Sequence, residues 1–541
     1  MPSTAETTAD LPTLGPVQRW LWRGEGDCGA KNLHYEQPSD LVARVFQESL
    51  AVVARRRAAG SLYNAKNKLA DETFAELAAV GYWGLLIPRE YGGAGGTLTT
   101  VLPFLTQMAV HDPTVAGLQN VHACIGPVQM LLRYGTPEQR QKFLPLLASG
   151  DRIGVFGLTE PNAGTDLTAL RTTAVREGEK YLVTGEKLFL TNLLPGRLLA
   201  LICLIDGSPA ALLVDLPPTE TPEFQLVRYG LHSLQHTHNH GCVLRELAVP
   251  VENRLEIPTG GGLQAAYHGL NRGRVALCAN AAGTLRLMLA NLLPWTEFRH
   301  SGGKPLASYQ LVRQRVARLE ELIRTCDALT LWGATLLDGG VRAEAEAIII
   351  KTFAAEALRE AAIDICLRTH GGRAFLAGHH LGDHLHDYLA PCIYEGENQI
   401  LLLALFKSLV KPHVREFYEP LEAALRAAKL PKLPVGNPFR MWRLRSAWMP
   451  LWRWRRSTAQ RARQADLAGE IAPYALQIDS AVARHGRDLA HEQQLLLSLA
   501  EGVAGVVVRQ VMTAAPASTF PLVPGEAAVQ PLLRPYSPGN A

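Results

Sequence analysis

The chain has little of what marks several classes of protein. Its formal net charge is only +4 over 541 residues, which is too small an excess to indicate a nucleic-acid partner. Its eight cysteines are scattered without paired spacing, so they predict reduced, mostly buried thiols of an intracellular protein. We therefore expect neither a disulfide framework nor a metal site.

A secretory signal and long hydrophobic runs are also absent. The first residues are polar, include Glu6 and Asp10, and do not form a basic start followed by an apolar core, so we expect a cytoplasmic protein. The apolar run 198–205 ends at Asp206 and Gly207, well short of a membrane span. It is typical of a buried strand. A chain of 541 residues is also long enough to form several domains, each with its own core.

The residue pattern changes three times along the chain. After a disordered-looking tail, helical spacing appears with helix starts at Asp71 and at Thr136, where an N-cap is followed by Pro137. Apolar and β-branched runs then give way to long helices. The pattern predicts an α+β multidomain fold. Its parts are a tail (1–39), an N-terminal helical domain (40–154), a middle β-barrel or sandwich domain (155–262), a four-helix bundle (263–411, with helices at 263–294, 308–338, 341–369 and 395–411) and a further segment (412–541).

Two distant stretches are the most informative about function. Residues 157–166 (Gly-Leu-Thr-Glu-Pro-Asn-Ala-Gly-Thr-Asp) predict a short strand that runs into a turn, whose free N–H groups and small hydroxyls suit a flat, anionic ligand. Residues 393–400 (Ile-Tyr-Glu-Gly-Glu-Asn-Gln-Ile) place Glu395 beside the apolar run 401–406. Burial would raise the pKa of this carboxylate and make it a proton acceptor. A Glu in such a position is more often a solvated helix-end residue, but the pairing favours the functional interpretation.

This pairing resembles the acyl-CoA dehydrogenase family, whose flavin loop reads Thr-Glu-Pro-x-Ala-Gly-Ser-Asp and whose catalytic segment reads Tyr-Glu-Gly-Thr. Four further segments are similar to family signatures and occur in the family's order, which is a stronger signal than one motif. They are residues 81–93, 134–142, 185–192 and 270–274. The resemblance covers about residues 40–410.

The resemblance implies a flavoenzyme that removes the elements of H₂ from the α and β carbons of a fatty acyl thioester. Glu395 would take the α proton, and its backbone N–H would donate to the thioester oxygen beside a ribityl hydroxyl of the flavin. FAD is required because no amino-acid side chain accepts a hydride in this way. The β domain would lie between the two helical domains, with the flavin in the cleft.

The resemblance also assigns contacts residue by residue. In the flavin loop, residues 156–165 would wrap the ring, with backbone groups of Leu158 and Thr159 at its pyrimidine edge. Arg299 and Gln310 would reach the FAD of a neighbouring subunit, although an isolated Arg is more often a surface cation. The full set for FAD is Phe156, Leu158, Thr159, Gly164, Thr165, Phe189, Leu190, Thr191, Arg299, Gln310, Arg368, Gly371, Gly372, Glu397, Asn398 and Gln399. The set for acyl-CoA is Thr165, Asn271, Arg274 and Gly396.

Several positions depart from the family pattern. Thr165 replaces Ser, Phe189 replaces the ring-covering Trp, Gly302-Gly303 replaces Phe-Gly, and His386-Asp387 replaces Arg-Asp. Glu397 stands where the family has Thr, and an extra carboxylate would repel a pyrophosphate. We hypothesise that Arg368, in place of the family Gln, is the compensating cation.

Two histidine clusters allow more than one interpretation. His232, His236, His238 and His240 alternate near Cys242 as metal ligands on a strand face would. A polar strand face without metal is favoured, because the segment aligns with a family stretch that binds none. The second cluster lies in the loop before the catalytic segment, and pocket-lining or loop residues are again favoured over metal ligands; it comprises His379, His380, His384 and His386.

Residues 437–456 combine six Arg and four Trp with no acid. Trp favours the lipid headgroup boundary and Arg is attracted to anionic lipid, so a surface-lying membrane anchor is one interpretation. A basic helix packed on another domain or at a dimer contact is the other. Pro450 would have to fall at a bend.

Residues 484–502 resemble the extra C-terminal helical domain of very-long-chain acyl-CoA dehydrogenases. That likeness implies a membrane-associated homodimer acting on long acyl chains, peripheral on the inner face of the membrane. The Pro-rich stretch 516–541 predicts an irregular tail.

The expected activity is FAD-dependent dehydrogenation of a long-chain acyl-CoA to the trans-2-enoyl-CoA in fatty-acid β-oxidation, with an electron-transferring flavoprotein as acceptor. An acyl-CoA oxidase and a catalytically degenerate, membrane-bound scaffold are the alternatives. Whether CoA or a carrier protein bears the thioester stays open.

Overall fold

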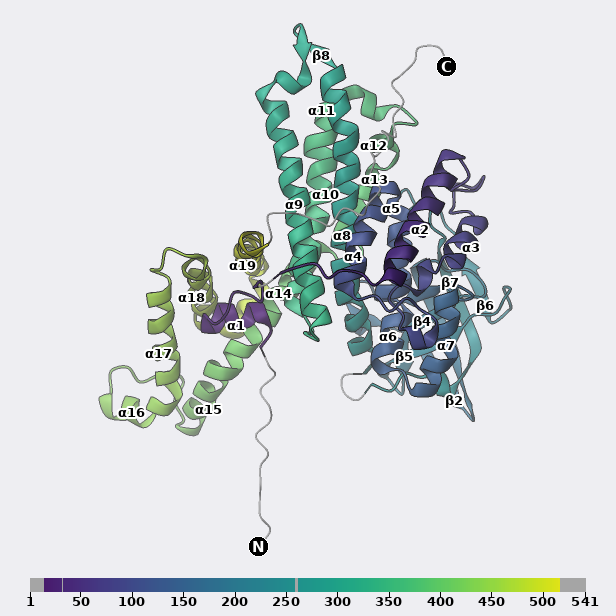
Figure 1. Ribbon diagram of the computed structural model, residues 1–541. Helices are drawn as coiled ribbons and strands as arrows, with labels where there is room; N and C mark the ends of the chain where they lie inside the picture. Colours follow the sequence, from purple (N-terminus) through teal and green to yellow (C-terminus); the bar gives the residue numbers. More distant parts are fainter. Residues whose placement is uncertain (1–13, 32, 258–260, 516–541) are drawn as a thin grey trace. The chain divides into compact units, whose positions relative to one another are not determined.

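A computed structural model describes residues 14–31, 33–257 and 261–515. The chain divides into two compact units. In the described range, the first contains residues 14–31, 341–349 and 401–515, and the second contains residues 33–340 and 350–400. Each unit is described separately below, with the helix and strand labels of Figure 1.

The second unit begins with a layer of helices. They are α2 (Asp40–Ala58), α3 (Asp71–Ala79), α4 (Leu98–His111), α5 (Pro113–Asn120), α6 (Pro127–Tyr134) and α7 (Pro137–Ser149). The predicted helix start at Thr136 is confirmed, because its hydroxyl accepts from Gln139 N–H while the Gln139 side chain accepts from Thr136 N–H. This reciprocal pair satisfies donors that a helix start otherwise leaves free.

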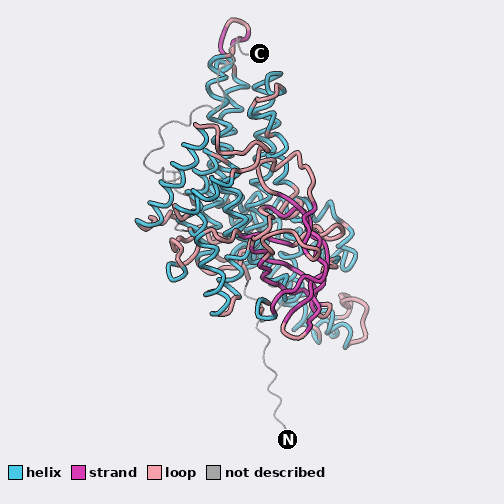
Figure 2. The backbone as a smooth tube through the Cα atoms, turned by 90° about the vertical axis from the view of Figure 1, so that its right-hand side faces the viewer, coloured by secondary structure: helices cyan, strands magenta, loops and turns pink. Residues whose placement is uncertain are grey.

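One seven-stranded sheet follows in the described chain (Figure 2). Its strands are β1 (Gly154–Gly157), β2 (Thr173–Glu177), β3 (Lys180–Thr191), β4 (Leu198–Ile205), β5 (Ser208–Asp215), β6 (Phe224–Val227) and β7 (Asn239–Pro250). The order is β1-β4-β2-β3-β7-β6, with β5 paired to β4, and β1 runs parallel to β4. The predicted buried strand at 198–205 is β4, which contributes side chains to cores on both faces of the sheet.

Long helices return after the sheet. They are α8 (Gly261–Phe298), α9 (Gln310–Asp338), α10 (Glu344–Glu360), a π-helical turn (Ala361–Leu367) leading into α11 (Arg368–His370), the short α12 (His380–Asp383) and α13 (Leu385–Leu389), and α14 (Asn398–His413). In Figure 1, α8 and α9 lie side by side, and they are packed on each other. The sequence predicted a helix from 395, but α14 begins at Asn398, so Glu395 lies in the preceding loop.

The first unit is helical and contains both chain ends of the described range. Its further helices are α1 (Pro16–Arg23), α15 (Glu419–Ala427), α16 (Pro438–Arg443), α17 (Arg445–Arg461), α18 (Leu467–His485) and α19 (Gln493–Ala514). The predicted tail 1–39 therefore needs correction. Trp22 of α1 stacks on His413 with ring centroids 4.2 Å apart and donates its indole N–H to Leu409 O. These contacts bury the apolar face of α1, and that burial favours the folded helix.

Pro450 also differs from its expected place. It lies inside α17 and not at a break between helices. It is the sixth residue of that helix, just beyond the first turn, so α17 lacks one hydrogen bond of its i→i−4 ladder there. The predicted irregular stretch 516–541 lies outside the described residues.

Two helices in the described chain, α8 and α19, are long and apolar enough to cross a membrane. The apolar window of α8 is 78% buried within the protein, and that of α19 is 44% buried. Core helices of soluble proteins are often as long and as apolar, so length and composition alone do not assign either helix to a membrane.

Candidate active site

Glu395 occupies a strained turn just before α14. Its φ is +58° and that of Gly396 is +102°. The left-handed region costs a residue with a side chain of the order of 1 kcal/mol or more, and such residues persist only where their surroundings hold them. The sequence singled out Glu395 but carried no sign of this conformation.

Glu395 is half-buried, and one of its two carboxylate oxygens is shielded from solvent. This oxygen, Oε2, has no hydrogen-bond partner among the described residues. A Cβ at Gly273 would lie 3.3 Å from this oxygen, so the glycine in α8 leaves the carboxylate room. Burial raises the pKa of Glu395 to about 7, against the opposing attraction of Lys351 and Arg274. A base with that pKa is well suited to work at neutral pH.

The predicted acyl-CoA residues on α8 lie against the same loop. The guanidinium of Arg274 donates to Glu395 O at 3.3 Å and to the Asn271 side chain at 3.2 Å. Both side chains are buried. The structure therefore brings Asn271, Arg274, Glu395 and Gly396 together, and their contacts with acyl-CoA stay a prediction.

The flavin-loop segment is built on a buried ion pair. Lys187 Nζ lies 2.7 Å from Glu160 Oε1, and Glu160 also accepts from Arg171 N–H and Thr172 N–H. Burial pushes the pKa of Glu160 upward, but its hydrogen bonds outweigh burial and hold that pKa below its ordinary value. Lys187 was missed from sequence, although it is a Lys inside an apolar strand pattern.

Hydrogen bonds within the protein show which backbone groups of the flavin loop are left for a ligand. Lys187 Nζ donates to Leu158 O at 2.9 Å, and Leu188 N–H donates to Thr159 O at 2.9 Å. Both carbonyls are thus already engaged. The N–H groups of Leu158 and Thr159 are the ones that we expect to meet a ligand's acceptors.

The residues around this loop fit FAD. No protein atom lies within 4 Å of a Cβ built at Gly164, Gly371 or Gly372, which leaves space for a cofactor's close approach to backbone. Phe189 has a φ of +59° and is 57% exposed. An exposed aromatic side chain can pack against the face of a flat ring. The other predicted contacts differ in exposure: Thr165 is exposed, Phe156, Leu158, Thr159 and Thr191 are half-buried, and Leu190 is buried in the sheet. Arg299 and Gln310 are exposed, at the end of α8 and the start of α9.

The hypothesis that Arg368 compensates Glu397 stays a prediction, and the structure shows which partner each of the two side chains has. Arg368 pairs with Asp364, one helical turn before it, at 2.9 Å. The Glu397 carboxylate instead accepts from Ile400 N–H at 2.9 Å. An acid at a helix start is stabilised by the free N–H groups and the helix dipole, so Glu397 has a structural partner of its own.

The histidine segment before β7 is not a strand face. Of its four histidines only His240 lies in β7, which begins at Asn239. His236 stacks on Tyr63 at 3.9 Å and shares a hydrogen bond with Asn67 O. In the described part of the chain no group of three or more His, Cys, Asp or Glu side chains is arranged to hold a metal.

The second histidine cluster meets the first. The ring centroids of His232 and His386 are 5.2 Å apart, those of His236 and His384 are 5.4 Å apart, and those of His380 and His384 are 5.1 Å apart. These rings lie in and around α12 and α13 rather than in an open loop. Burial is the main reason why the pKa of His380 falls to about 3.

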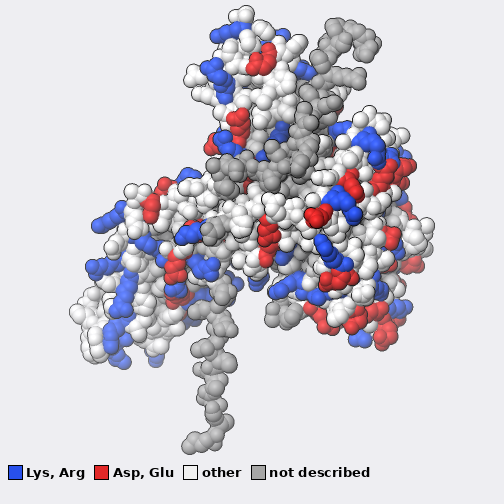
Figure 3. Space-filling model, viewed as in Figure 1, with Lys and Arg blue, Asp and Glu red and all other residues white. Residues whose placement is uncertain are grey.

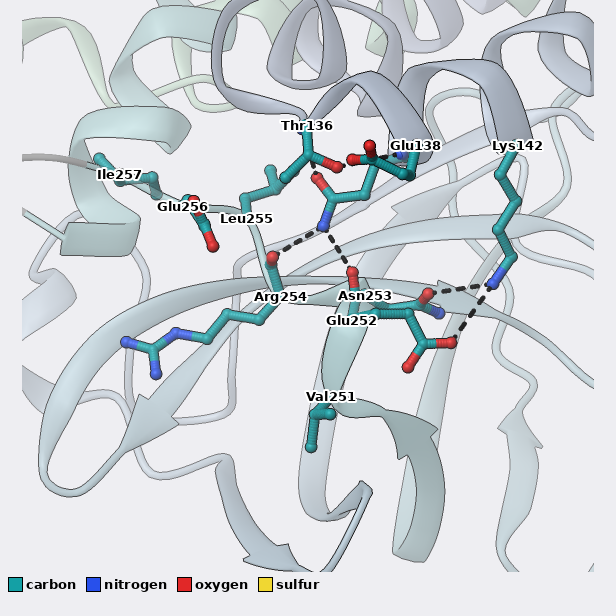
Figure 4. A pocket seen from close by; sticks show the side chains of 11 residues that line it. Thr136, Glu138, Lys142, Val251, Glu252, Asn253, Arg254, Leu255, Glu256 and Ile257 are labelled. Carbon is teal, nitrogen blue, oxygen red and sulfur yellow. Dashed lines mark hydrogen bonds and ion pairs between the residues drawn. The ribbon is translucent and has the colours of Figure 1, made fainter.

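A large cavity lies elsewhere. It has a volume of about 710 Å³ and lies between α7 and the segment after β7, with Gln139 donating to the carbonyls of Glu252 and Arg254 across it (Figure 4). None of its lining residues is a predicted site residue. The candidate site is therefore identified by the Glu395 carboxylate and not by the size of a cavity.

Comparison with known proteins identifies the family. The model of the acyl-CoA dehydrogenase N-terminal domain matches residues 35–151, and that of the acyl-CoA dehydrogenase C-terminal domain matches residues 260–410. An acyl-CoA dehydrogenase of Bacillus subtilis is 30% identical over 336 residues, which cover 61% of this chain and 87% of the relative. The chain belongs to the acyl-CoA dehydrogenase family. It is therefore an FAD-dependent oxidoreductase that acts on CH–CH groups.

Two further similar proteins are a human enzyme and a solved structure. The human mitochondrial very-long-chain specific acyl-CoA dehydrogenase is 28% identical over 62% of this chain and 52% of its own length. The structure of an acyl-CoA dehydrogenase complexed with FAD from Bacillus anthracis has a TM-score of 0.69 and is 18% identical, covering 88% of this chain and 83% of that one. The fold of this acyl-CoA dehydrogenase thus extends beyond the regions that the two family models match.

Proposed function

We propose that the protein dehydrogenates a long-chain fatty acyl-CoA to the trans-2-enoyl-CoA in fatty-acid β-oxidation, with Glu395 as the base. The observation that carries this proposal is the Glu395 carboxylate, which is half-buried, lacks a hydrogen-bond partner at Oε2 and has a pKa raised to about 7. A structural carboxylate in such a place would be expected to have its lone pairs satisfied.

In this mechanism the chain's own residues handle the α proton. Glu395 Oε2 accepts it, and the N–H of Glu395 donates to the thioester oxygen as negative charge develops there. Arg274 fixes the loop through its bond to Glu395 O. FAD, when bound, supplies the acceptor for the β hydrogen and its electron pair.

The long acyl chain and the electron acceptor are also proposals. The likeness to the human very-long-chain relative and the helices beyond residue 411 support a long-chain substrate. An electron-transferring flavoprotein then reoxidises the enzyme. An oxidase would instead form hydrogen peroxide in air, so peroxide at a rate equal to substrate turnover would overturn this part.

The proposed enzyme is a homodimer. Phe298 and Leu311 are exposed next to Arg299 and Gln310 at the adjoining ends of α8 and α9. Apolar side chains flanking a cation and an amide fit a second copy, whose cofactor the polar pair would reach. Light scattering of the purified protein is expected to give twice the chain mass, and a monomer that retains FAD would contradict the assignment.

The first unit is proposed to lie on the inner face of an anionic membrane. Phe439 and Trp442 of α16 are exposed, Trp442 at 59%, while Trp454 of α17 is packed inward. Arg445 lies 4.2 Å from the Trp442 ring, and Lys and Arg predominate over Asp and Glu on the visible face of this unit (Figure 3). Exposed Trp with Arg beside it suits the headgroup layer.

Vesicle sedimentation tests this surface. Wild type is expected to sediment with phosphatidylglycerol vesicles and much less with phosphatidylcholine vesicles. The double variant Phe439→Ser/Trp442→Ser should stay in solution, whereas Val175→Ser, which removes an exposed apolar side chain on β2, should bind as wild type does. Unchanged binding of the double variant would contradict the proposal.

The activity is tested by the visible spectrum of the purified protein before and after anaerobic addition of palmitoyl-CoA. Yellow flavin that bleaches in wild type, but not in Glu395→Gln with equal flavin content, is the expected result. Bleaching of that variant at the wild-type rate would remove Glu395 from its role. Protein that cannot be loaded with FAD would favour the scaffold alternative.

A further inference from the structure

A buried lysine on α10 touches the loop that carries Glu395. Lys351 has no exposed surface. Its ammonium group donates to Gly396 O at 2.5 Å and to Asn398 Oδ1 at 2.8 Å. Asn398 in turn donates to Glu356 Oε1 at 2.8 Å, on the same helix as Lys351. Gly396 and Asn398, which flank Glu397, are therefore both hydrogen-bonded to α10.

These bonds are made where the backbone is strained. Glu395 and Gly396 both have positive φ, and relaxation of that turn would move the carboxylate. Glu395 O is held by Arg274 on α8, and Gly396 O is held by Lys351 on α10. Two cations on different helices therefore donate hydrogen bonds to consecutive carbonyls of the turn. A strained functional residue persists only where its surroundings hold it in this way.

Lys351 is also the largest opposing influence on the Glu395 charge. Burial raises the pKa of Glu395, and the attraction of Lys351 is the first effect that lowers it, followed by that of Arg274. Burial lowers the pKa of Lys351, which Glu395 raises again. The other titratable groups near the pair are Cys392, Tyr394 and Glu397 in the loop, and Cys124 before α6.

We propose that Lys351 is a positioning residue for catalysis, which holds the strained turn by its hydrogen bonds and keeps the Glu395 carboxylate ionisable at neutral pH by its charge. The inference rests on the proposed role of Glu395. An ammonium group buried against a base that must ionise offsets part of the cost of creating charge there. It makes no bond to substrate, and it acts through Glu395.

The obvious competing interpretation is that Lys351 only stabilises the fold. A buried lysine with two acceptors is what a purely structural residue would look like as well. The two interpretations differ in one readout. A structural lysine changes the amount of folded, flavin-loaded protein, whereas a positioning lysine changes the pH at which the loaded protein becomes active.

The test compares two variants of the full chain. Lys351→Met removes the charge and both hydrogen bonds. Lys351→Gln removes the charge but keeps a donor for Gly396 O, and it is the variant more compatible with folding. Arg176→Gln, which removes an exposed cation on β2, controls for net charge. The rate of anaerobic flavin bleaching by palmitoyl-CoA is measured from pH 5.5 to 9 at equal FAD content.

We expect the acidic midpoint of the wild-type profile near pH 7. Both Lys351 variants should move it upward by about one pH unit or more, because the ionised carboxylate loses its nearest cation. KM should change by less than about twofold, while kcat at pH 7 falls about tenfold or more. At high pH, Lys351→Gln should be faster than Lys351→Met, since it keeps one anchor of the turn.

Midpoints in both variants that equal the wild-type midpoint would overturn the proposal, even if the rates fall. Failure of the underlying function looks different, because Glu395→Gln would then still bleach. If Glu395→Gln is inactive and the Lys351 midpoints do not move, Glu395 keeps its role and Lys351 loses its own. If Lys351→Met does not fold, Lys351→Gln alone decides.

Discussion

Each unit of the molecule contains a carboxylate that is at least half-buried, and the two carboxylates are treated in opposite ways. In the second unit, Glu395 Oε2 has no partner in the described chain. In the first unit, Asp479 of α18 accepts from His413 at 2.9 Å, from Tyr418 at 2.7 Å and from Arg455 at 2.6 Å. Asp479 is buried and Glu395 is half-buried, so exposure alone would not give Glu395 the higher pKa.

The number of partners decides what each carboxylate can do. Burial pushes the pKa of Asp479 upward, but bonds from His413, Arg455 and Tyr418 outweigh it and hold that pKa below its ordinary value. For Glu395 burial prevails, and the pKa rises to about 7. Asp479 stays charged and joins helices, whereas Glu395 is able to exchange a proton near neutral pH.

Substitution of each acid should separate the two roles most sharply. Glu395→Gln is expected to lower the rate of flavin bleaching by about 10²–10⁴-fold, the usual contribution of a positioned base. Its melting temperature should stay within a few degrees of wild type, because no hydrogen bond to Oε2 is lost. A variant that loses stability and keeps its rate would reverse the comparison.

Asp479→Ala is expected to give the opposite result. Removal of one partner from a buried ion pair leaves the others unpaired and costs about 3 kcal/mol or more. Because Arg455 is partly exposed and can reach water, we expect a loss of unfolding free energy of about 3 kcal/mol and not more. Chemical denaturation followed by Trp fluorescence would measure the loss, which should exceed that of the surface variant Arg426→Ala. The bleaching rate per bound flavin should be unchanged, and a rate that falls as in Glu395→Gln would contradict the account.

Glu397 provides a smaller test of partner number. Its carboxylate accepts from Ile400 N–H at the start of α14. Glu397→Ala should therefore cost about 1 kcal/mol of unfolding free energy, as loss of a helix cap does. Glu397→Asn, which keeps a capping acceptor, is the matched control and should cost less. A gain in FAD affinity in either variant would indicate instead that the carboxylate repels the cofactor.

The smallest effect near neutral pH concerns the buried histidines. Burial is the largest cause that lowers the pKa of His122 to about 3 and that of His238 to about 4, with His370 and His380 also at about 3. Below pH 6.5 the unfolded chain binds protons that the folded chain does not, so stability should fall as pH drops from 6.5 toward 4. Melting temperatures measured at pH 8, 6.5 and 5 check this, and a midpoint that is highest at pH 5 would contradict it.

Much of the fold could be predicted from sequence, because family-like motifs and apolar periodicity are local signals. The strand at 198–205 and the capping box at Thr136 are of this kind. The helix α1 was missed, although Val17, Trp20 and Leu21 have helical spacing and are buried. A short helix of eight residues depends on its tertiary contacts rather than on its own propensity.

The supports of the site could not be predicted because they depend on contacts between distant residues. Lys351 and Asn398 are 47 positions apart, and no local pattern joins them. The only local sign was a Lys inside the apolar run 348–353. The ion pair of Arg368 with Asp364, one helical turn before it, is by contrast a local contact at i,i+4 spacing.

The most direct test of the account is exchange of the substrate's α proton with D₂O. An acyl-CoA analogue with sulfur in place of the β carbon can lose an α proton but cannot give up a β hydride. Incubated with FAD-loaded wild type, it should incorporate deuterium at the α carbon, with a rate that rises through about pH 7. Glu395→Gln should show no exchange above the buffer rate. Exchange at the wild-type rate in that variant would contradict the assignment of Glu395 as the base.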